Sequence, residues 1–264
     1  MDMLERLTEA SRARLRACRL ELPLSGLMCL CDGLPKPGFA FEKALAAPGL
    51  SFICEVKKAS PSKGVIAESF PYVDIALEYE AGGADCLSVL TEPEYFLGSD
   101  ACLEEIARAV SLPVLRKDFT VDLYQVYQAR LLGAGAVLLI CAALPAHRLA
   151  ECMDAAEGLG ISALVEVRDE RELETAVSLG ARLVGANNRD LRTFEVDMGN
   201  SLRLRQLAPP GTIFVAESGI GGRGDVEALE RGGVDAVLVG ESLMRRADRR
   251  AALMELRGAC GGGP

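Results

Sequence analysis

Short apolar runs alternate with amphipathic segments along the chain from residue 51 onward. The runs are continuous and rich in Val, Ile and Leu, which is typical of strands that are covered on both faces. We predict eight strands, at Phe52–Val56, Cys86–Leu90, Val114–Lys117, Ala136–Cys141, Ala163–Val167, Leu183–Asn187, Ile213–Glu217 and Ala236–Gly240. The segments between them show helical spacing, as in CLEEIARAV and RELETAVSLG. Strands that alternate with helices predict βαβ units and a parallel sheet.

A glycine-containing turn recurs before several of these strands. Glycine can take the left-handed conformation that ends a helix before the chain enters the next strand. The turns are Gly82–Asp85, Gly133–Gly135, Gly180–Arg182 and Gly232–Asp235. Eight such units in 264 residues favour an α/β fold, a (β/α)8 TIM barrel, which typically has roughly 250 residues. The alternative is an open doubly wound sheet, but none of the runs is as short or polar as an edge strand should be.

Residues 1–50 stand outside the repeat. Met1–Leu20 predicts an amphipathic helix with many arginines, and a Pro/Gly-punctuated stretch leads to a short helix near Phe41–Ala47. This segment is too short to form a core of its own. We therefore expect a single domain overall, in which an N-terminal helical extension, residues 1–50, caps one end of a catalytic barrel of residues 51–264.

Composition narrows the possible partners. Half of the residues are apolar and Trp is absent, so branched aliphatic side chains must fill the barrel. The net charge of −9 argues against a nucleic-acid or anionic-membrane partner. No apolar run approaches the roughly 18 residues of a membrane span, and the charged N-terminus lacks the apolar segment of a secretory signal.

The nine cysteines indicate reduced thiols rather than a metal or disulfide framework. Their number is odd, no CxxC occurs, and the spacing of Cys29 and Cys31 fits no common zinc pattern. Most of the others lie in apolar runs, where Cys behaves as a small hydrophobe. His147 is the only histidine, so a multi-His metal site is excluded. We expect a cytoplasmic protein with no metal site.

Polar residues end several of the predicted strands, and the active sites of TIM barrels lie at the C-terminal strand ends. Side chains alternate along a strand, so residues of one parity share a face. The inward sets run from apolar or small to polar: Ile53, Glu55 and Lys57; Leu115, Lys117 and Phe119; Leu164 and Glu166; Gly185, Asn187 and Arg189. A structural ion pair at the rim is the alternative for Glu55 and Lys57. Two lysines and two glutamates in one mouth exceed what stability requires, so we predict a lysine–carboxylate catalytic site.

Anion binding is predicted beside this site. The segment Lys57–Gly64 is cationic and small, which suits a mobile loop that closes over an anion, although a solvated surface loop has the same composition. The last two strands end in AESGIGG and VGESLM. Loops at these positions often bind phosphate through backbone N–H groups in this fold. We expect Glu241 to contribute its N–H there, while its carboxylate points away.

At these residues the chain resembles the indole-3-glycerol phosphate synthase family. The matching segments, from about residue 4 to residue 246, are CEVKKASPSKG, SVLTEPEYFLGS, PVLRKDF, LLI, LVEV, GANNRDL, VAESGI and VLVGESLMR. The resemblance implies conversion of 1-(2-carboxyphenylamino)-1-deoxyribulose 5-phosphate to indole-3-glycerol phosphate in tryptophan biosynthesis. Carbon dioxide and water are lost, without a metal or an organic cofactor.

The resemblance also implies roles for individual residues. Lys117 would be the general acid on the ketose oxygen and Glu166 the base for dehydration, while Glu55 and Lys57 order the site. The further contacts would be Asn187 and Arg189 on hydroxyl or carboxylate oxygens, Ser60, Phe96, Phe119, Leu138 and Ile140 along the substrate, and Lys57, Ser218, Gly219, Gly240 and Glu241 at the phosphate. Ring closure needs an acid at the carbonyl oxygen, and packing beside Lys57 should lower the pKa of Lys117 and aid the donation.

Two other functions use the same residue types. A Schiff-base aldolase would use Lys117 or Lys57 as a nucleophile on a phosphosugar, and a non-catalytic protein would only bind the phosphosugar. Binding alone does not require both an acid and a base, so Lys117 together with Glu166 counts against the latter. For partners we expect only the small phosphorylated substrate, a monomer or weak homo-oligomer, and possible association with other enzymes of the pathway.

Overall fold

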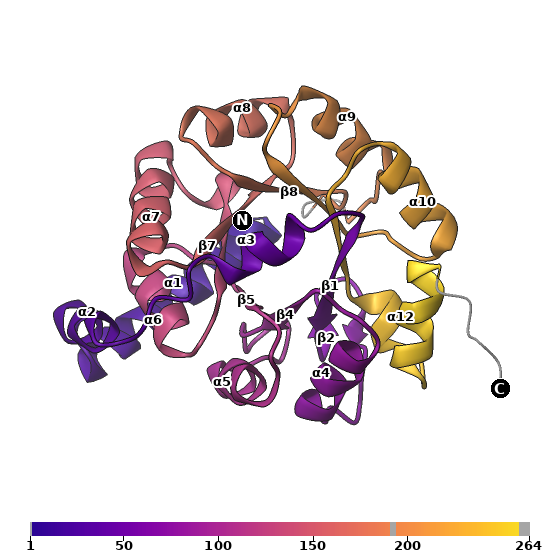
Figure 1. Ribbon diagram of the computed structural model, residues 1–264. Coiled ribbons are helices and arrows are strands. Elements are labelled where there is room, and N and C mark those ends of the chain that lie inside the picture. The colour runs from indigo at the N-terminus through magenta and orange to yellow at the C-terminus, as the bar shows by residue number, and fades with distance from the viewer. Residues whose placement is uncertain (1, 191–193, 259–264) are drawn as a thin grey trace.

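The computed structural model describes residues 2–190 and 194–258, and eight parallel strands close into a barrel at its centre (Figure 1). The strands are β1 (Ser51–Val56), β4 (Cys86–Leu90), β5 (Val114–Lys117), β6 (Ala136–Ile140), β7 (Ser162–Val167), β8 (Leu183–Asn187), β9 (Ile213–Glu217) and β10 (Ala236–Val239). Because β1 pairs with both β4 and β10, the sheet has no edge. The TIM barrel is thereby confirmed, the open doubly wound sheet is excluded, and every strand boundary agrees with the sequence to within one residue.

A ring of helices surrounds the strands. It consists of α4 (Tyr72–Ala81), α5 (Asp100–Ala109), α6 (Leu123–Leu131), α7 (Ala146–Leu159), α8 (Glu170–Ser178), α9 (Gly199–Leu207), α10 (Arg223–Arg231) and α12 (Arg249–Arg257). Shorter elements lie in the loops: β2 (Ala59–Ser60), β3 (Gly64–Val65), η1 (Cys141–Ala143) and α11 (Glu241–Met244). The predicted turn glycines Gly83, Gly133, Gly180 and Gly233 all have positive φ, between 76° and 89°. Their left-handed conformation is thus confirmed.

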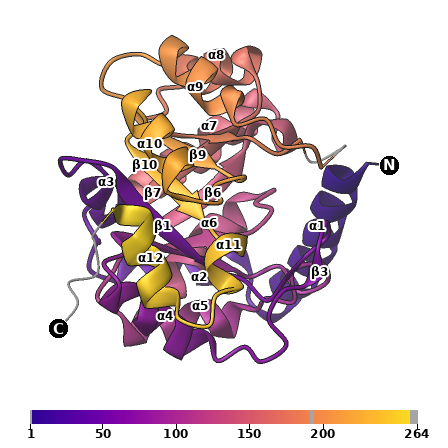
Figure 2. The same cartoon turned by 90° about the vertical axis from the view of Figure 1, so that its right-hand side faces the viewer.

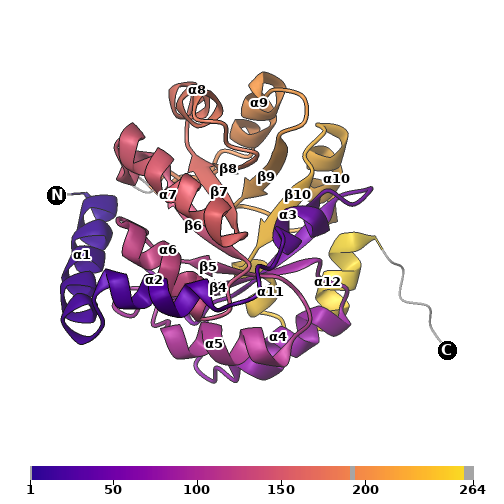
Figure 3. The ribbon, with the colours of Figure 1, turned by 60° about the vertical axis from the view of Figure 1, so that its left-hand side comes forward.

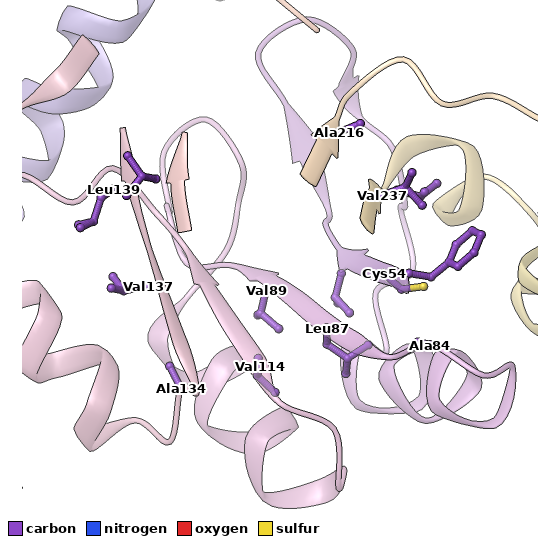
Figure 4. Packing of buried hydrophobic residues seen from close by; sticks show 14 of the residues in the cluster. Cys54, Ala84, Leu87, Val89, Val114, Ala134, Val137, Leu139, Ala216 and Val237 are labelled. Carbon is purple, nitrogen blue, oxygen red and sulfur yellow. The ribbon is translucent and has the colours of Figure 1, made fainter. Parts of the chain in front are cut away.

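Apolar side chains form two layers that follow the alternation of each strand. One layer fills the barrel, where Ile53, Leu115, Leu164 and Val215 meet around its axis. The other lies between strands and helices, and Figure 4 shows part of it, including Cys54. Cys54 therefore faces outward, as its parity predicts. The site residues lie on the opposite, inward faces of the strands.

The N-terminal extension reaches both ends of the barrel rather than one. It contains α1 (Met3–Glu21), α2 (Leu24–Asp32) and α3 (Ala40–Leu45). In Figure 2, α3 and α1 lie on opposite sides of the barrel. Phe41 and Leu45 of α3 pack on the interior cluster at the N-terminal strand ends, whereas Leu7 of α1 lines the opposite mouth. Met1 and residues 259–264, which the proposed domain limits include, lie outside the described residues.

Helix α2 was not expected from the sequence. Pro23 and Gly26 punctuate this stretch, but Pro23 is the N-cap and thus precedes the first helical turn. Leu27 and Cys31 are buried in α2, which packs against α6 (Figure 3). Within the described residues, no helix is long and apolar enough to span a membrane.

Candidate active site

The C-terminal strand ends open into a cavity of about 360 Å³. This volume falls within the range of small-molecule sites. Every site residue proposed from the sequence contributes to its lining: Glu55, Lys57, Ser60, Phe96, Lys117, Phe119, Leu138, Ile140, Glu166, Asn187, Arg189, Ser218, Gly219, Gly240 and Glu241. The barrel thus brings residues that are up to 186 positions apart (Glu55 to Glu241) into one cavity.

Lys117 lies at the floor of the cavity between two carboxylates. Its Nζ donates a hydrogen bond to Oε2 of Glu217 and lies 3.3 Å from Oε2 of Glu166. The side chain of Glu217 is 2 % exposed and that of Lys117 is 13 % exposed. Buried charges of this kind require partners, and here the two carboxylates supply them.

The pKa of Lys117 is raised, so the expected lowering by Lys57 is wrong. Burial alone would lower this pKa, but the negative charges of Glu217, Glu166 and Glu55 outweigh burial. Lys57 does not act on it as expected, because its own amino group donates to Oε2 of Glu55. Lys117 is therefore an ammonium group at neutral pH and holds the proton that a general acid needs.

Glu217 is a site residue that the sequence reasoning missed. It ends β9 and precedes the Ser218–Gly219 turn, so the segment was assigned to phosphate binding alone. The alternation along the strand could have indicated it, because Val215 and Glu217 face inward in the same way as Leu115 and Lys117. Burial raises the pKa of Glu217 to about 7, and the charge of Glu166 adds to this while Lys117 opposes it.

The raised pKa of Glu217 gives the stability a pH dependence. The native state holds this proton more tightly than the unfolded chain, whose glutamates titrate near 4.5. The stability contributed by the protonated form is therefore complete below about pH 4.5 and is lost as the pH rises through about 7. Since Lys117 stays protonated over this range, it adds no slope of its own.

We expect Glu217→Gln to remove this slope. Urea unfolding at pH 5, 6 and 7 should show the wild-type protein losing stability relative to the variant as the pH rises. Glu174→Gln, at an exposed position on α8, is the control and should run parallel to the wild type. A constant difference between wild type and Glu217→Gln would contradict the assignment.

Glu55 and Lys57 form a second ion pair at the rim. Glu55 lies on the inward face of β1 and is buried. Lys57 follows the end of the strand with the same parity. Gly240 lies against this pair, since a Cβ on Gly240 would come within 3.0 Å of Nζ of Lys57. Both members of the pair therefore lie next to the backbone turn that follows β10.

Asn187 connects Glu166 to the loop after β8. Its Nδ2 donates to Oε1 of Glu166 at 3.3 Å, and its Oδ1 accepts from the backbone N–H of Arg189 at 3.0 Å. The guanidinium of Arg189 donates to the carbonyl of Phe194 at 3.1 Å. The contact from Asn187 orients Glu166, and the bond to Phe194 holds the Arg189 guanidinium at the cavity wall.

The opposite wall is aromatic and aliphatic. The rings of Phe96 and Phe119 lie 6.0 Å apart, centroid to centroid. Phe96 is held by its loop, where its N–H donates to the buried carboxylate of Glu92 at 3.0 Å. Its carbonyl accepts from the N–H of Ala59 at 3.2 Å. With Leu138 and Ile140 from β6, this wall offers an apolar surface of the kind that a planar ring contacts well.

The extension helix α1 also contributes to the site, which the sequence did not indicate. Met3 and Leu7 line the cavity directly. Further along α1, Ser11 donates to the carbonyl of Phe119 at 2.6 Å, and Arg14 binds the buried carboxylate of Asp118 at 2.7 Å. The helix is thus fastened to the segment that follows Lys117.

Two backbone turns form the end of the cavity predicted to bind phosphate. Ser218 and Gly219 have φ of 70° and 83°, the left-handed region that is rare for serine. The carbonyl of Ser218 accepts from Nδ2 of the buried Asn188 at 3.1 Å. The carboxylate of Glu241 binds Arg245 at 3.0 Å, so its negative charge is offset.

The loop after β1 contains more structure than the sequence indicated. Within Lys57–Gly64 and its continuation, β2 and β3 pair as a short antiparallel hairpin. The N–H of Ile66 donates to the carbonyl of Lys58 at 2.8 Å and closes its base. Ser60, Pro61 and Ser62 of the hairpin line the cavity. Over residues 2–190 and 194–258, no group of three or more His, Cys, Asp and Glu side chains could hold a metal ion.

Comparison with known proteins agrees with this geometry. Residues 4–256 match the model of the family described as indole-3-glycerol phosphate synthase. An enzyme of that name from Ruminiclostridium cellulolyticum is 52 % identical over 97 % of this chain and 99 % of its own length. A second, from Lachnoclostridium phytofermentans, is 43 % identical over 97 % of this chain and 98 % of its own.

Solved structures of other proteins share the fold at low identity. A 3-hexulose-6-phosphate synthase has a TM-score of 0.65 and 17 % identity, over 80 % of this chain and all of its own. A thiamine phosphate pyrophosphorylase from Pyrococcus furiosus has a TM-score of 0.60 and 19 % identity, over 80 % of this chain and 95 % of its own. These two likenesses show the barrel alone.

The family match, by contrast, extends over nearly the whole chain and includes each strand end that lines the cavity. The chain therefore belongs to the indole-3-glycerol phosphate synthase family, carboxy-lyases that convert 1-(2-carboxyphenylamino)-1-deoxyribulose 5-phosphate to indole-3-glycerol phosphate in tryptophan biosynthesis.

Proposed function

We propose that Lys117 is the general acid and Glu166 the general base of this ring closure. The observation that carries the proposal is the position of the Lys117 ammonium at the cavity floor, 3.3 Å from Glu166 and bonded to Glu217. An acid and a base within one cavity can act on neighbouring atoms of one bound substrate.

Ring closure is the step assigned to Lys117. The aromatic carbon that bears the carboxylate attacks the ketose carbonyl carbon, and the carbonyl oxygen takes a proton from Lys117. An alkoxide is a stronger base than an amine, so this transfer is favourable although the neighbouring carboxylates raise the pKa of Lys117. Loss of carbon dioxide then returns the electron pair of the broken C–C bond to the ring and restores its aromaticity.

Dehydration is the step assigned to Glu166. Lys117, reprotonated from solvent after ring closure, gives a second proton to the new hydroxyl group, which leaves as water while the ring nitrogen supplies the electrons. Glu166 then removes a proton from the adjacent carbon, which completes the indole. Its hydrogen bond from Asn187 at 3.3 Å fixes the carboxylate for this transfer.

Binding is assigned to the rest of the lining. Phe96, Phe119, Leu138 and Ile140 would hold the aromatic ring, while Arg189 and Asn187 would bind carboxylate or hydroxyl oxygens. The phosphate would lie at the other end, against the backbone N–H groups of Ser218, Gly219, Gly240 and Glu241, with Ser60 beside it. Lys57, ordered by Glu55, would meet an anionic group of the substrate, since it is close to Gly240.

We further propose that the protein works in the cytoplasm as a monomer or a weak homo-oligomer. The negative net charge of −9 supports a small-molecule substrate over a nucleic acid or an anionic membrane. We also propose that it associates with other enzymes of the pathway.

The proposal is tested by supplying the carboxyphenylamino-deoxyribulose phosphate to the pure protein and following indole absorbance. We expect indole to appear without an added metal or cofactor, and no covalent adduct when borohydride is added during turnover. A borohydride-trapped adduct on Lys117 or Lys57 would instead identify a Schiff-base mechanism, and the absence of product would refute the proposed function.

A further inference from the structure

The charged floor of the cavity is one layer of the barrel. Glu55, Lys117, Glu166 and Glu217 come from β1, β5, β7 and β9, which are alternate strands, as in the layers that fill TIM barrels. Strand β8 lies between β7 and β9, and its Gly185 pairs with Glu166 on one side and Val215 on the other. A glycine thus lies between the strands that carry Glu166 and Glu217.

The backbone at Gly185 does not require glycine. Gly185 is not among the positive-φ glycines of the described residues, and it lies within a strand that pairs on both sides. Glycine inside a strand weakens it and often marks a place where another group comes close. The reason for glycine here must therefore be space.

That space is filled by the carboxylate of Glu217. A Cβ on Gly185 would lie 3.3 Å from Cδ of Glu217 and would collide with its Oε1. It would also come within 3.2 Å of Cδ1 of the buried Leu164, and the Glu217 side chain that would have to shift is itself buried. Oε1 itself is buried and has no hydrogen-bond partner among the residues that the structure describes, whereas Oε2 accepts from Lys117.

We propose that Gly185 is a positioning residue whose missing side chain forms a notch for the Glu217 carboxylate, which in turn holds Lys117 in place. One oxygen of Glu217 is seated by shape in the notch, and the other binds the ammonium group. The pair of Glu55 and Lys57 also lies against a glycine, since a Cβ on Gly240 would collide with Oε2 of Glu55, the oxygen that binds Lys57. The inference rests on the proposed role of Lys117, because the notch matters to turnover through that side chain.

The test is Gly185→Ala. A methyl group in the notch displaces the carboxylate of Glu217, and a misplacement of about 1 Å can cost about 10²-fold in rate. We expect kcat to fall by about 10²-fold while KM changes little, because the residues assigned to the aromatic ring and the phosphate of the substrate keep their places. Gly135→Ala is the matched control, since a Cβ there would meet nothing closer than 3.5 Å, and it should retain the wild-type kcat.

A shorter acid should relieve the clash. Glu217→Asp alone should lower kcat, yet the double variant Gly185→Ala with Glu217→Asp should be about tenfold more active than Gly185→Ala alone, the kind of coupling that contacting residues show. If Gly185→Ala does not fold, recovery of folding in the double variant supports the notch. Strictly additive losses, or no recovery of folding, would overturn it.

A readout that does not depend on turnover separates this inference from the proposed function. Nuclear magnetic resonance of labelled lysine Nζ should show a lower pKa for Lys117 in Gly185→Ala than in the wild type, because a stabilising carboxylate has moved away. An unchanged pKa would overturn the notch even if kcat fell. Failure of the wild type to form product would refute the proposed function and leave this titration as the test of the notch.

Discussion

Lys117→Met is expected to reduce kcat by about 10³-fold or more, the largest effect of any single substitution in this site. Methionine keeps the length of the side chain but carries no proton to give to the ketose oxygen. The carboxylates of Glu166 and Glu217 lose their shared ammonium partner, so the charge balance of the floor changes as well.

Steady-state indole formation measures this effect, and equilibrium binding of the substrate shows whether the cavity persists. Lys43→Met, at an exposed position on α3, is the matched control and should keep the wild-type kcat. If Lys117→Met retained more than about a tenth of the wild-type rate, another group would have to be the acid.

Glu166→Gln is expected to reduce kcat by about 10²- to 10³-fold. The amide has nearly the shape of the carboxylate, so substrate binding should survive while the base is lost. Lys117 keeps Glu217 as a partner and therefore stays at the floor. The same indole assay measures the loss, and Glu174→Gln on the surface of α8 is the control. If kcat fell no more in Glu166→Gln than in Glu174→Gln, Glu166 would take no part in the reaction.

The barrel was predictable because its physical cause is local. Each buried strand is a continuous apolar run, and each helix before β4, β6, β8 and β10 is followed two residues later by a glycine that takes positive φ. The inward alternation was local too, which is why Glu55, Lys117, Glu166 and Asn187 could be placed in one cavity.

The features that could not be predicted depend on contacts between distant segments. The raised pKa of Lys117 comes first from Glu217, 100 positions away, and the sequence left the ion pair of Lys57 with Glu55 as one of two alternatives. Helix α2 was missed because Pro23 and Gly26 are typical of a loop. In the structure Pro23 is the N-cap of the helix and Gly26 lies in its first turn. The contribution of α1 to the cavity depends on its docking on Asp118 and Phe119, which no periodicity reveals.

The central claim, that Lys117 and Glu166 serve successive steps on one substrate, is tested most directly by a single-turnover experiment that measures carbon dioxide and indole separately. The account predicts that Lys117→Met releases neither product. Glu166→Gln should release close to one equivalent of carbon dioxide well before indole appears, because ring closure and decarboxylation precede the step that needs the base. Equal slowing of both products in Glu166→Gln, or carbon dioxide release by Lys117→Met at the wild-type rate, would contradict it.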